Sequence, residues 1–251
     1  MGMKRVGWFT TGRGPGSLGL FNAVRSKVRG GELAAELSFV FLNRDVRGNP
    51  YRAQLIAMAE EDGIPVLILP SDSFRSDLKA KDIDAWRAAY GEAMREMMAE
   101  HPMDLGVLAG YMLILDPETC ARYDIINLHP ALPNTYQGTW EEIVRRVAES
   151  EDRTYGSMVH VCTPELDRGR TVAYDEFGIE DLRERFHSKE ELAKALRQRQ
   201  VGREVPLLME TLKLLTDGDL TLVRGELRDR MGRPLSIGPN LSARIDQLVH
   251  G

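Results

Sequence analysis

The feature that most constrains this chain is an alternation of short apolar runs with longer segments of helical spacing. The apolar runs cover residues 5–10, 37–42, 65–69, 105–109 and 125–128. Apolar residues recur at helical spacing in 17–28, 49–62 and 82–100. Such alternation is typical of a parallel sheet covered by helices. The sequence therefore predicts an α/β fold.

The second half of the chain continues the pattern less clearly. We expect a helix over 139–148, a strand over 157–162 and a helix over 188–215 that Pro206 breaks or kinks. Residues 220–251 show two short strand-like pieces and little else. We therefore expect a catalytic domain over 1–219 and a C-terminal extension of unknown role over 220–251.

Composition narrows the classes of partner. The chain has 33 basic and 38 acidic residues and a net charge of −5, so no strong positive field is expected to attract nucleic acid. Only Cys120 and Cys162 are present, and we interpret both as reduced core residues. Neither an export signal nor a run of about 18 apolar residues is visible. The sequence predicts a cytoplasmic protein without a membrane partner, as a monomer or homodimer.

A glycine-rich turn follows the first predicted strand and precedes a helix. There, backbone N–H groups and the positive end of a helix dipole favour a phosphate or carboxylate. An acidic residue typical of dinucleotide sites is missing about 20 residues on, where Asn43 and Arg44 stand. A phosphate-bearing substrate, a redox nucleotide and a purely structural turn remain open. The candidate phosphate-binding residues are Gly12, Arg13, Gly14, Gly16 and Ser17.

A second motif, Asn-Leu-His-Pro at residues 127–130, lies at the end of the apolar run 125–128, where ligands bind in open α/β sheets. Asn127 and His129 alternate along an extended chain, so their side chains point the same way. An amide and an imidazole would then face one reacting group. The competing interpretation is a histidine satisfied by backbone groups, with the asparagine starting a turn.

Several segments in the same order resemble the formyltetrahydrofolate-dependent formyltransferases, most closely the phosphoribosylglycinamide formyltransferases. They are residues 11–14 with Ser17, 43–44 with Gly48, 108–112 with 114–115, 127–130 with 132–133 and Gly138, 156–161, and 165–167 with Gly169. The resemblance covers roughly residues 4–215. It implies a Rossmann-like, mostly parallel twisted sheet with helices on both faces, and 10-formyltetrahydrofolate as co-substrate.

The resemblance also implies roles for individual residues. Asn127 would donate to the oxyanion of formyl transfer, His129 would move the proton, and Asp167 would orient or stabilise the imidazole. The residues expected to line the folate site are Tyr111, Met112, Leu113, Ile114, Leu115, His160 and Leu166. For His160, a buried structural role stays open. No metal is expected, since no closely spaced histidine pair is visible.

Departures from the family pattern concern the acceptor. The loop between Pro130 and Pro133 is short, Leu18 replaces an asparagine, and Val201 or its neighbours occupy the place of a glutamate near the glycinamide amine. The expected reaction is formyl transfer to the primary amine of a phosphorylated small molecule, by default glycinamide ribonucleotide. The alternatives are another amine, such as a nucleotide-linked amino sugar, and a non-catalytic nucleotide-binding homologue.

Overall fold

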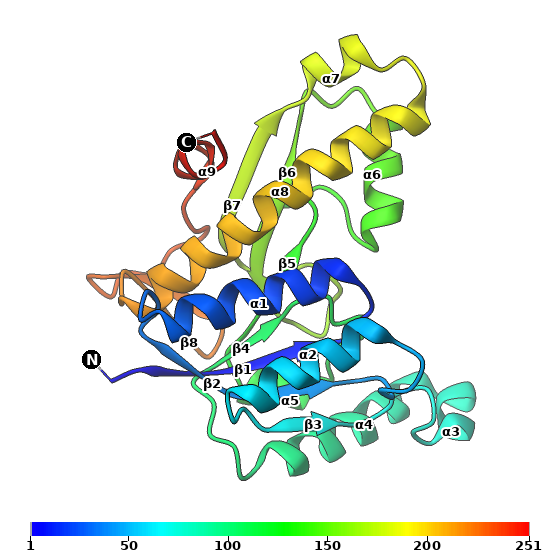
Figure 1. Ribbon diagram of the computed structural model, residues 1–251, viewed down its shortest axis with the longest axis vertical. Coiled ribbons are helices and arrows are strands. Elements are labelled where there is room, and N and C mark those ends of the chain that lie inside the picture. The colour runs from blue at the N-terminus through cyan, green and yellow to red at the C-terminus, as the bar shows by residue number, and fades with distance from the viewer. Residues whose placement is uncertain (1, 251) are drawn as a thin grey trace.

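The computed structural model describes residues 2–250 and is built around a seven-stranded sheet (Figure 1). The strand order is β3-β2-β1-β4-β5-β6-β7, parallel from β3 to β5 and antiparallel at the β5–β6 and β6–β7 pairs. The predicted α/β class and mostly parallel sheet are confirmed. The strands are β1 (Lys4–Thr10), β2 (Ala35–Leu42), β3 (Val66–Ile68), β4 (Leu105–Leu108), β5 (Ile125–His129), β6 (Thr154–Val161) and β7 (Thr171–Gly178).

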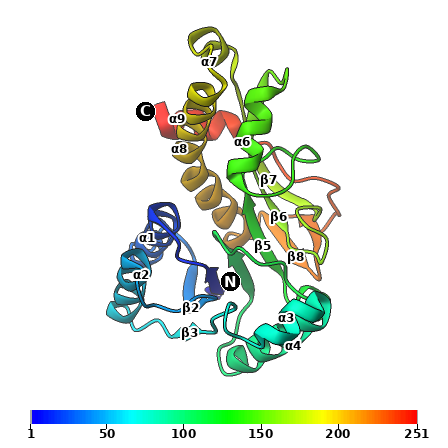
Figure 2. The same cartoon turned by 90° about the vertical axis from the view of Figure 1, so that its right-hand side faces the viewer.

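Helices cover both faces of the sheet, as Figure 2 shows for α1 and α2 on one side and α3 and α4 on the other. They are α1 (Pro15–Arg29), α2 (Pro50–Glu61), α3 (Ser76–Lys81), α4 (Ile83–Met98), α5 (Pro117–Arg122), α6 (Trp140–Glu149), α7 (Glu180–Arg185), α8 (Lys189–Thr216) and α9 (Ser242–His250). Because strand side chains alternate, Trp8 packs beside Phe21 of α1 in one core cluster, and Phe9 lies in another cluster with Met94 of α4.

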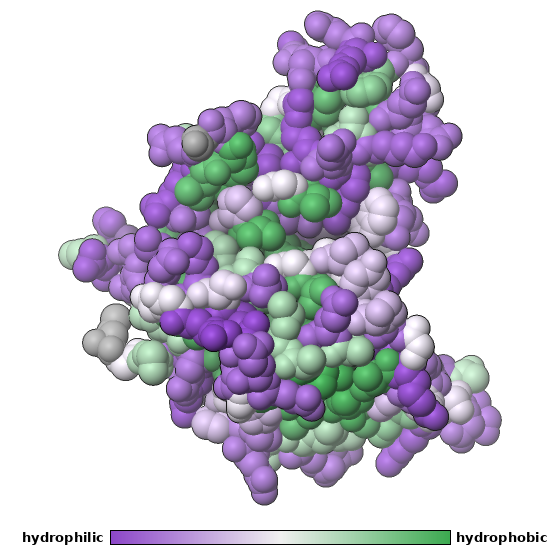
Figure 3. Space-filling view, in the orientation of Figure 1, coloured by the Kyte–Doolittle hydropathy of each residue, from purple (hydrophilic) through white to green (hydrophobic). Residues whose placement is uncertain are grey.

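The edge of the sheet is less well covered than its centre. All three residues of β3 are only half-buried, whereas all four residues of β4 are buried. Figure 3 shows apolar side chains gathered on one face near α2 and β3, within a surface that is otherwise mostly polar. The central strands, which carry the candidate site at their ends, are therefore the better-packed part of the sheet.

Helix α8 runs for 28 residues with Pro206 inside it. Of the two predicted outcomes, the break at Pro206 is wrong, and the kink stays a prediction. A proline removes the hydrogen bond to the carbonyl four residues earlier, here that of Gly202. Gly202 is exposed, so water can take up that carbonyl. Buried leucines on both sides anchor the two halves, Leu196 in the core around α6 and α7 and Leu207 in the core around α1.

Residues 220–250 form a hairpin and a helix that pack on the rest of the chain. The hairpin pairs β8 (Leu220–Val223) with β9 (Glu226–Asp229), and α9 contacts α8 and β7. Leu220, Leu227 and Ile245 are buried in the same core as α1 and α8. The sequence predicted neither α9 nor β7. No helix within the described residues is long and apolar enough to cross a membrane.

Candidate active site

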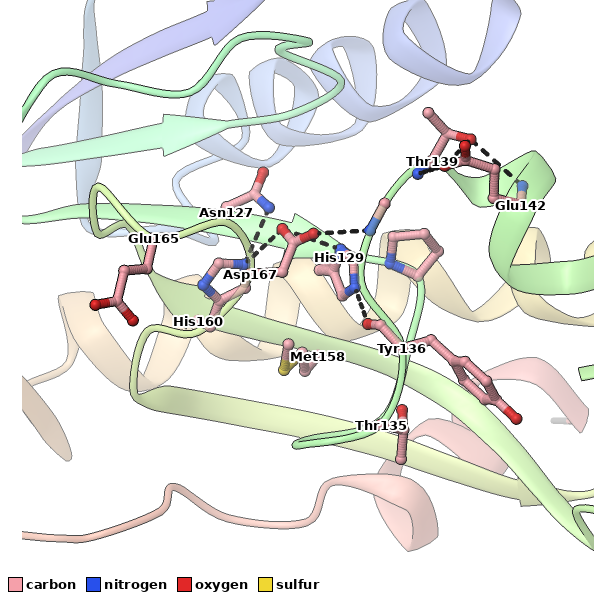
Figure 4. A network of polar contacts seen from close by, with 12 residues as sticks. Asn127, His129, Thr135, Tyr136, Thr139, Glu142, Met158, His160, Glu165 and Asp167 are labelled. Carbon is pink, nitrogen blue, oxygen red and sulfur yellow. Dashed lines mark hydrogen bonds and ion pairs between the residues drawn. The ribbon is translucent and has the colours of Figure 1, made fainter. Parts of the chain in front are cut away.

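Three elements bring the candidate catalytic side chains together (Figure 4). Asn127 and His129 lie on β5, near the end of the strand. His160 on β6 is the direct antiparallel partner of Asn127. Asp167 comes from the loop between β6 and β7, which folds back over both histidines. Residues up to 40 positions apart thus meet because β5, β6 and the loop are adjacent in space.

The side chains form one connected polar cluster. His129 Nδ1 lies 3.3 Å from Asp167 Oδ1, and the same oxygen lies 3.6 Å from His160 Nε2. Asn127 Nδ2 lies 3.1 Å from His160 Nε2. The side chains of His129 and Asp167 are only 3% and 7% exposed, so water screens their interaction weakly. The predicted amide, imidazole and carboxylate are therefore brought to one place.

Backbone carbonyls fix which nitrogen of each imidazole carries the hydrogen. His129 Nε2 lies 2.9 Å from the carbonyl of Tyr136, and His160 Nδ1 lies 2.9 Å from the carbonyl of Val161. A carbonyl can only accept, so both of these nitrogens donate. In the neutral rings, Nδ1 of His129 and Nε2 of His160 then carry lone pairs. Both lone pairs face the interior of the cluster.

The electrostatics keep His129 ready to accept a proton. Burial lowers the pKa of His129 below its usual value of 6.5, and the attraction of Asp167 only partly opposes this. Burial would raise the pKa of Asp167, but the neighbouring imidazoles of His160 and His129 and the Gly138 N–H together lower it. At neutral pH the arrangement is therefore a neutral imidazole beside an ionised carboxylate.

The loop that carries Asp167 is held in an unusual conformation. Asp167 has φ +53°, in the left-handed region that side chains rarely adopt. Gly138 N, 3.1 Å away, donates to Asp167 Oδ2. At Gly169 a Cβ atom would lie 1.6 Å from the carbonyl oxygen of Val161, so only glycine fits there. Strain of this kind persists where surrounding contacts fix a functional side chain.

The glycine-rich turn lies at the N-terminus of α1, as predicted. Asn49 donates to the carbonyl of Arg13 and so fixes the turn from the β2–α2 loop. The first turn of α1 has no acidic side chain, and a Cβ on Gly14 or Gly16 would meet no atom within 4 Å. The N-terminal backbone is therefore open to an anion. Asn43, at the end of β2, is buried and has no hydrogen-bond partner for either amide atom among the described residues.

The predicted folate-lining residues divide into buried and exposed groups. Tyr111 and Leu115 are buried in the core on the α4 face, and Leu113 and Ile114 are half-buried. Met112 and Leu166 are each 45% exposed, which makes them the apolar side chains that a bound ring could cover. The Met112 N–H donates to Thr11 Oγ1, and Thr11 N–H donates to the Gly110 carbonyl. These bonds join the predicted folate segment to the predicted phosphate turn.

A separate cavity of about 930 Å³ lies between α4 and α5, lined among others by Arg95, Asp116 and Tyr123. None of the predicted site residues lines it. Arg95 and Asp116 instead form a buried ion pair at 2.7 Å. This cavity and the polar cluster are thus different places.

Although His129 and His160 were both predicted site residues, the sequence did not reveal three contacts of the cluster. The Tyr136 carbonyl and the Gly138 N–H are backbone groups, and the identity of a side chain does not predict a contact made by the backbone. His129 and His160 are distant in sequence, so the short spacing typical of metal sites could not reveal them. With Asp167 they offer ligand atoms within 4.8 Å of one another. The signal that could have found this pair is the antiparallel register of β5 and β6.

The fold and the cluster define an α/β protein with an amide, an imidazole and a carboxylate at the end of its central strands. Residues 16–212 match the family model described as formyl transferase, and the chain belongs to this family.

Individual relatives agree with the family. The phosphoribosylglycinamide formyltransferase of Dictyostelium discoideum is 34% identical over 134 residues, which are 47% of this chain and 65% of that protein. The enzyme of the same name from Haemophilus influenzae is 27% identical over 197 residues, covering 75% of this chain and 82% of the relative. This chain thus spans just under two thirds of the first relative and more of the second.

The solved structures confirm the Rossmann-like formyltransferase fold. The phosphoribosylglycinamide formyltransferase of Coxiella burnetii superposes with a TM-score of 0.72 at 22% identity, over 94% of this chain and 99% of that one. A formyltetrahydrofolate deformylase of Pseudomonas syringae has a TM-score of 0.65 at 22% identity, over 89% of this chain and 65% of that one. The fold alone is therefore shared by transferases and a deformylase.

Proposed function

We propose that this chain transfers a formyl group from 10-formyltetrahydrofolate to the primary amine of a phosphorylated small molecule, with glycinamide ribonucleotide as the default acceptor. The observation that carries the proposal is the 3.3 Å approach of His129 to Asp167 beside Asn127, in a member of the formyl transferase family. The names of the two relatives support the default acceptor.

In the first step the acceptor nitrogen attacks the formyl carbon. The new C–N bond forms while the carbonyl π electrons move onto oxygen. Asn127 Nδ2 has two hydrogens and gives one to His160, so the second is free to donate to the oxyanion. One positioned donor of this kind contributes about 3 kcal/mol to transition-state stabilisation.

The proton of the attacking amine then moves through His129. Nδ1 accepts it, and the resulting imidazolium is stabilised by the ionised Asp167 at 3.3 Å. As the tetrahedral intermediate collapses, the bond from carbon to the folate N10 breaks. Its electron pair goes to N10, which takes the proton from His129. The products are the N-formylated amine and tetrahydrofolate, and His129 is neutral again.

Binding would be divided between two neighbouring segments. The open N-terminus of α1 would hold the acceptor's phosphate, while Met112 and Leu166 would cover the folate ring. Burial of these two exposed side chains by the ring would add a hydrophobic contribution.

One observation favours a different amine. Val201, which occupies or adjoins the place of a glutamate in the glycinamide enzymes, is an apolar side chain 42% exposed on α8. Nearby, Glu204 is paired with Arg197 and so is not free to receive an amine. An acceptor whose amine needs no carboxylate partner would suit this surface, and a nucleotide-linked amino sugar is the second candidate.

The test is a panel of amines incubated with purified full-length chain and 10-formyltetrahydrofolate labelled in the formyl group. We expect label to appear on glycinamide ribonucleotide, and to be lost in His129→Ala but not in the surface variant His187→Ala. Label on another amine and none on glycinamide ribonucleotide would reject the default acceptor. Labelled free formate as the sole product would point to hydrolysis instead, and no turnover with tight nucleotide binding would favour the non-catalytic alternative.

A further inference from the structure

The polar cluster contains more acceptors than donors. Because both histidines give their N–H to backbone carbonyls, their remaining ring nitrogens face Asp167 Oδ1 as lone pairs, at 3.3 and 3.6 Å. Gly138 N–H is directed to the other carboxylate oxygen, Oδ2. Among the described residues, only the Asn127 amide donates toward these three acceptors.

Converging lone pairs of this kind favour a positive charge between them. A proton can fill that role during formyl transfer. A metal ion can fill it as well, because the three ligand atoms lie within 4.8 Å of one another. In a tetrahedral zinc site with bonds of about 2.0–2.1 Å, neighbouring ligand atoms are about 3.4 Å apart. The distances of 3.3 and 3.6 Å to Asp167 Oδ1 are close to this value.

The surroundings also match those of metal-binding histidines. Such histidines typically donate the other ring N–H to a carbonyl or carboxylate, which fixes the ring and its tautomer. His129 does so to Tyr136 and His160 to Val161. Two imidazoles and one carboxylate are a donor set for borderline transition metals and not for Mg²⁺ or Ca²⁺, which prefer oxygen ligands.

We propose that His129, His160 and Asp167 form an inhibitory binding site for a transition-metal dication such as Zn²⁺, with its fourth position open. The ion is not a cofactor of the reaction. It takes the lone pair of His129 that would receive the amine proton. It also takes the His160 lone pair that accepts from Asn127, so the carboxamide loses the contact that orients it. Zn²⁺ binding therefore stops formyl transfer.

The site can be tested with Co²⁺, whose visible absorption is strong in four-coordinate sites and weak in water. Titration of the full-length wild type with Co²⁺ alone should give intense bands that one equivalent of Zn²⁺ removes and excess Mg²⁺ does not. His160→Gln and Asp167→Asn should each weaken Co²⁺ binding by more than the roughly 10- to 100-fold that loss of a supporting contact costs. The matched control His187→Gln, an exposed histidine outside the cluster, should bind like the wild type.

Circular dichroism of each variant checks that it is folded. Equal Co²⁺ affinity in the wild type and both cluster variants, or spectra of six-coordinate Co²⁺ only, would overturn the proposal. A thiolate-to-metal charge-transfer band would overturn it too, because it would place the ion at Cys120 or Cys162. Since metal binding is read without any substrate, a chain that binds Co²⁺ but transfers no formyl group contradicts the proposed function and leaves this site standing.

Discussion

The glycine-rich turn and the polar cluster are built in opposite ways, although both lie at strand ends of one sheet. At the turn, the Arg13 side chain is 69% exposed, and Gly14 and Gly16 have open space around them. In the cluster, the side chains of His129 and Asp167 are almost fully buried and fixed by several contacts. An open backbone surface can hold a group without changing it, whereas buried ionisable groups can move a proton. We therefore expect the turn to control KM and the cluster to control kcat.

The largest effect should follow from His129→Ala. The variant loses the base that takes the amine proton, which predicts a fall in kcat of about 10²- to 10⁴-fold. The acceptor's KM should change little, because the proposed phosphate site is at the turn. Steady-state kinetics of both substrates measure the split, with His187→Ala as the control. A rise in KM at unchanged kcat would break the division between the two regions.

The next largest effect is expected for Asn127→Ala, a loss of about 10²- to 10³-fold in kcat from removal of one oxyanion donor. The variant His160→Gln tests whether His160 acts on the reaction only by orienting Asn127. If positioning is the whole role of His160, the double variant should be no slower than Asn127→Ala alone. Additive losses in kcat would show that His160 acts separately.

The sequence revealed the turn more completely than the cluster. The turn is local, so its residues and its strand–turn–helix context could be recognised within one segment. The cluster depends on the register between β5 and β6 and on the left-handed conformation of Asp167, neither of which the residue types specify. Parallel strands were visible as apolar runs. Strand β7 was not, because Tyr174, Asp175 and Glu176 interrupt its apolar residues, and Asp175 is buried only because Arg203 of α8 pairs with it.

The pH dependence of kcat/KM should report on the polar cluster. The depressed pKa of His129 means that its neutral, proton-accepting form persists below pH 6.5, and activity is lost as pH falls through the folded-state pKa. The lowered pKa of Asp167 keeps that group ionised over the same range. We expect kcat/KM to fall by up to about tenfold per pH unit on an acid limb centred below 6.5. A limb centred above 6.5 would contradict the assigned base.

A smaller effect is expected at the turn from Gly16→Asp. The new carboxylate would lie in the first turn of α1, where it repels a phosphate by about 1–2 kcal/mol, or roughly tenfold in acceptor KM. The same charge should stabilise the helix N-terminus by about 0.3–1 kcal/mol, so thermal stability should not fall. Gly16→Asn is the matched control without charge. If both variants raised KM equally, the size of the side chain and not its charge would be responsible.

The smallest effect on acceptor KM should come from Arg13→Gln. This variant is informative when it is compared with Glu141→Gln. Arg13 and Glu141 approach to 3.7 Å between the turn and the first residues of α6, and both side chains are well exposed. Exposed pairs contribute at most about 1 kcal/mol, so neither substitution should measurably change the unfolding temperature. If Arg13 also meets the acceptor's phosphate, only Arg13→Gln should raise KM, by about twofold to fivefold. Glu141→Gln should then leave KM unchanged or lower it, because the guanidinium is released for the phosphate. Equal changes in acceptor KM in both variants would mean that acceptor binding depends on the ion pair between the turn and α6, and not on Arg13 alone.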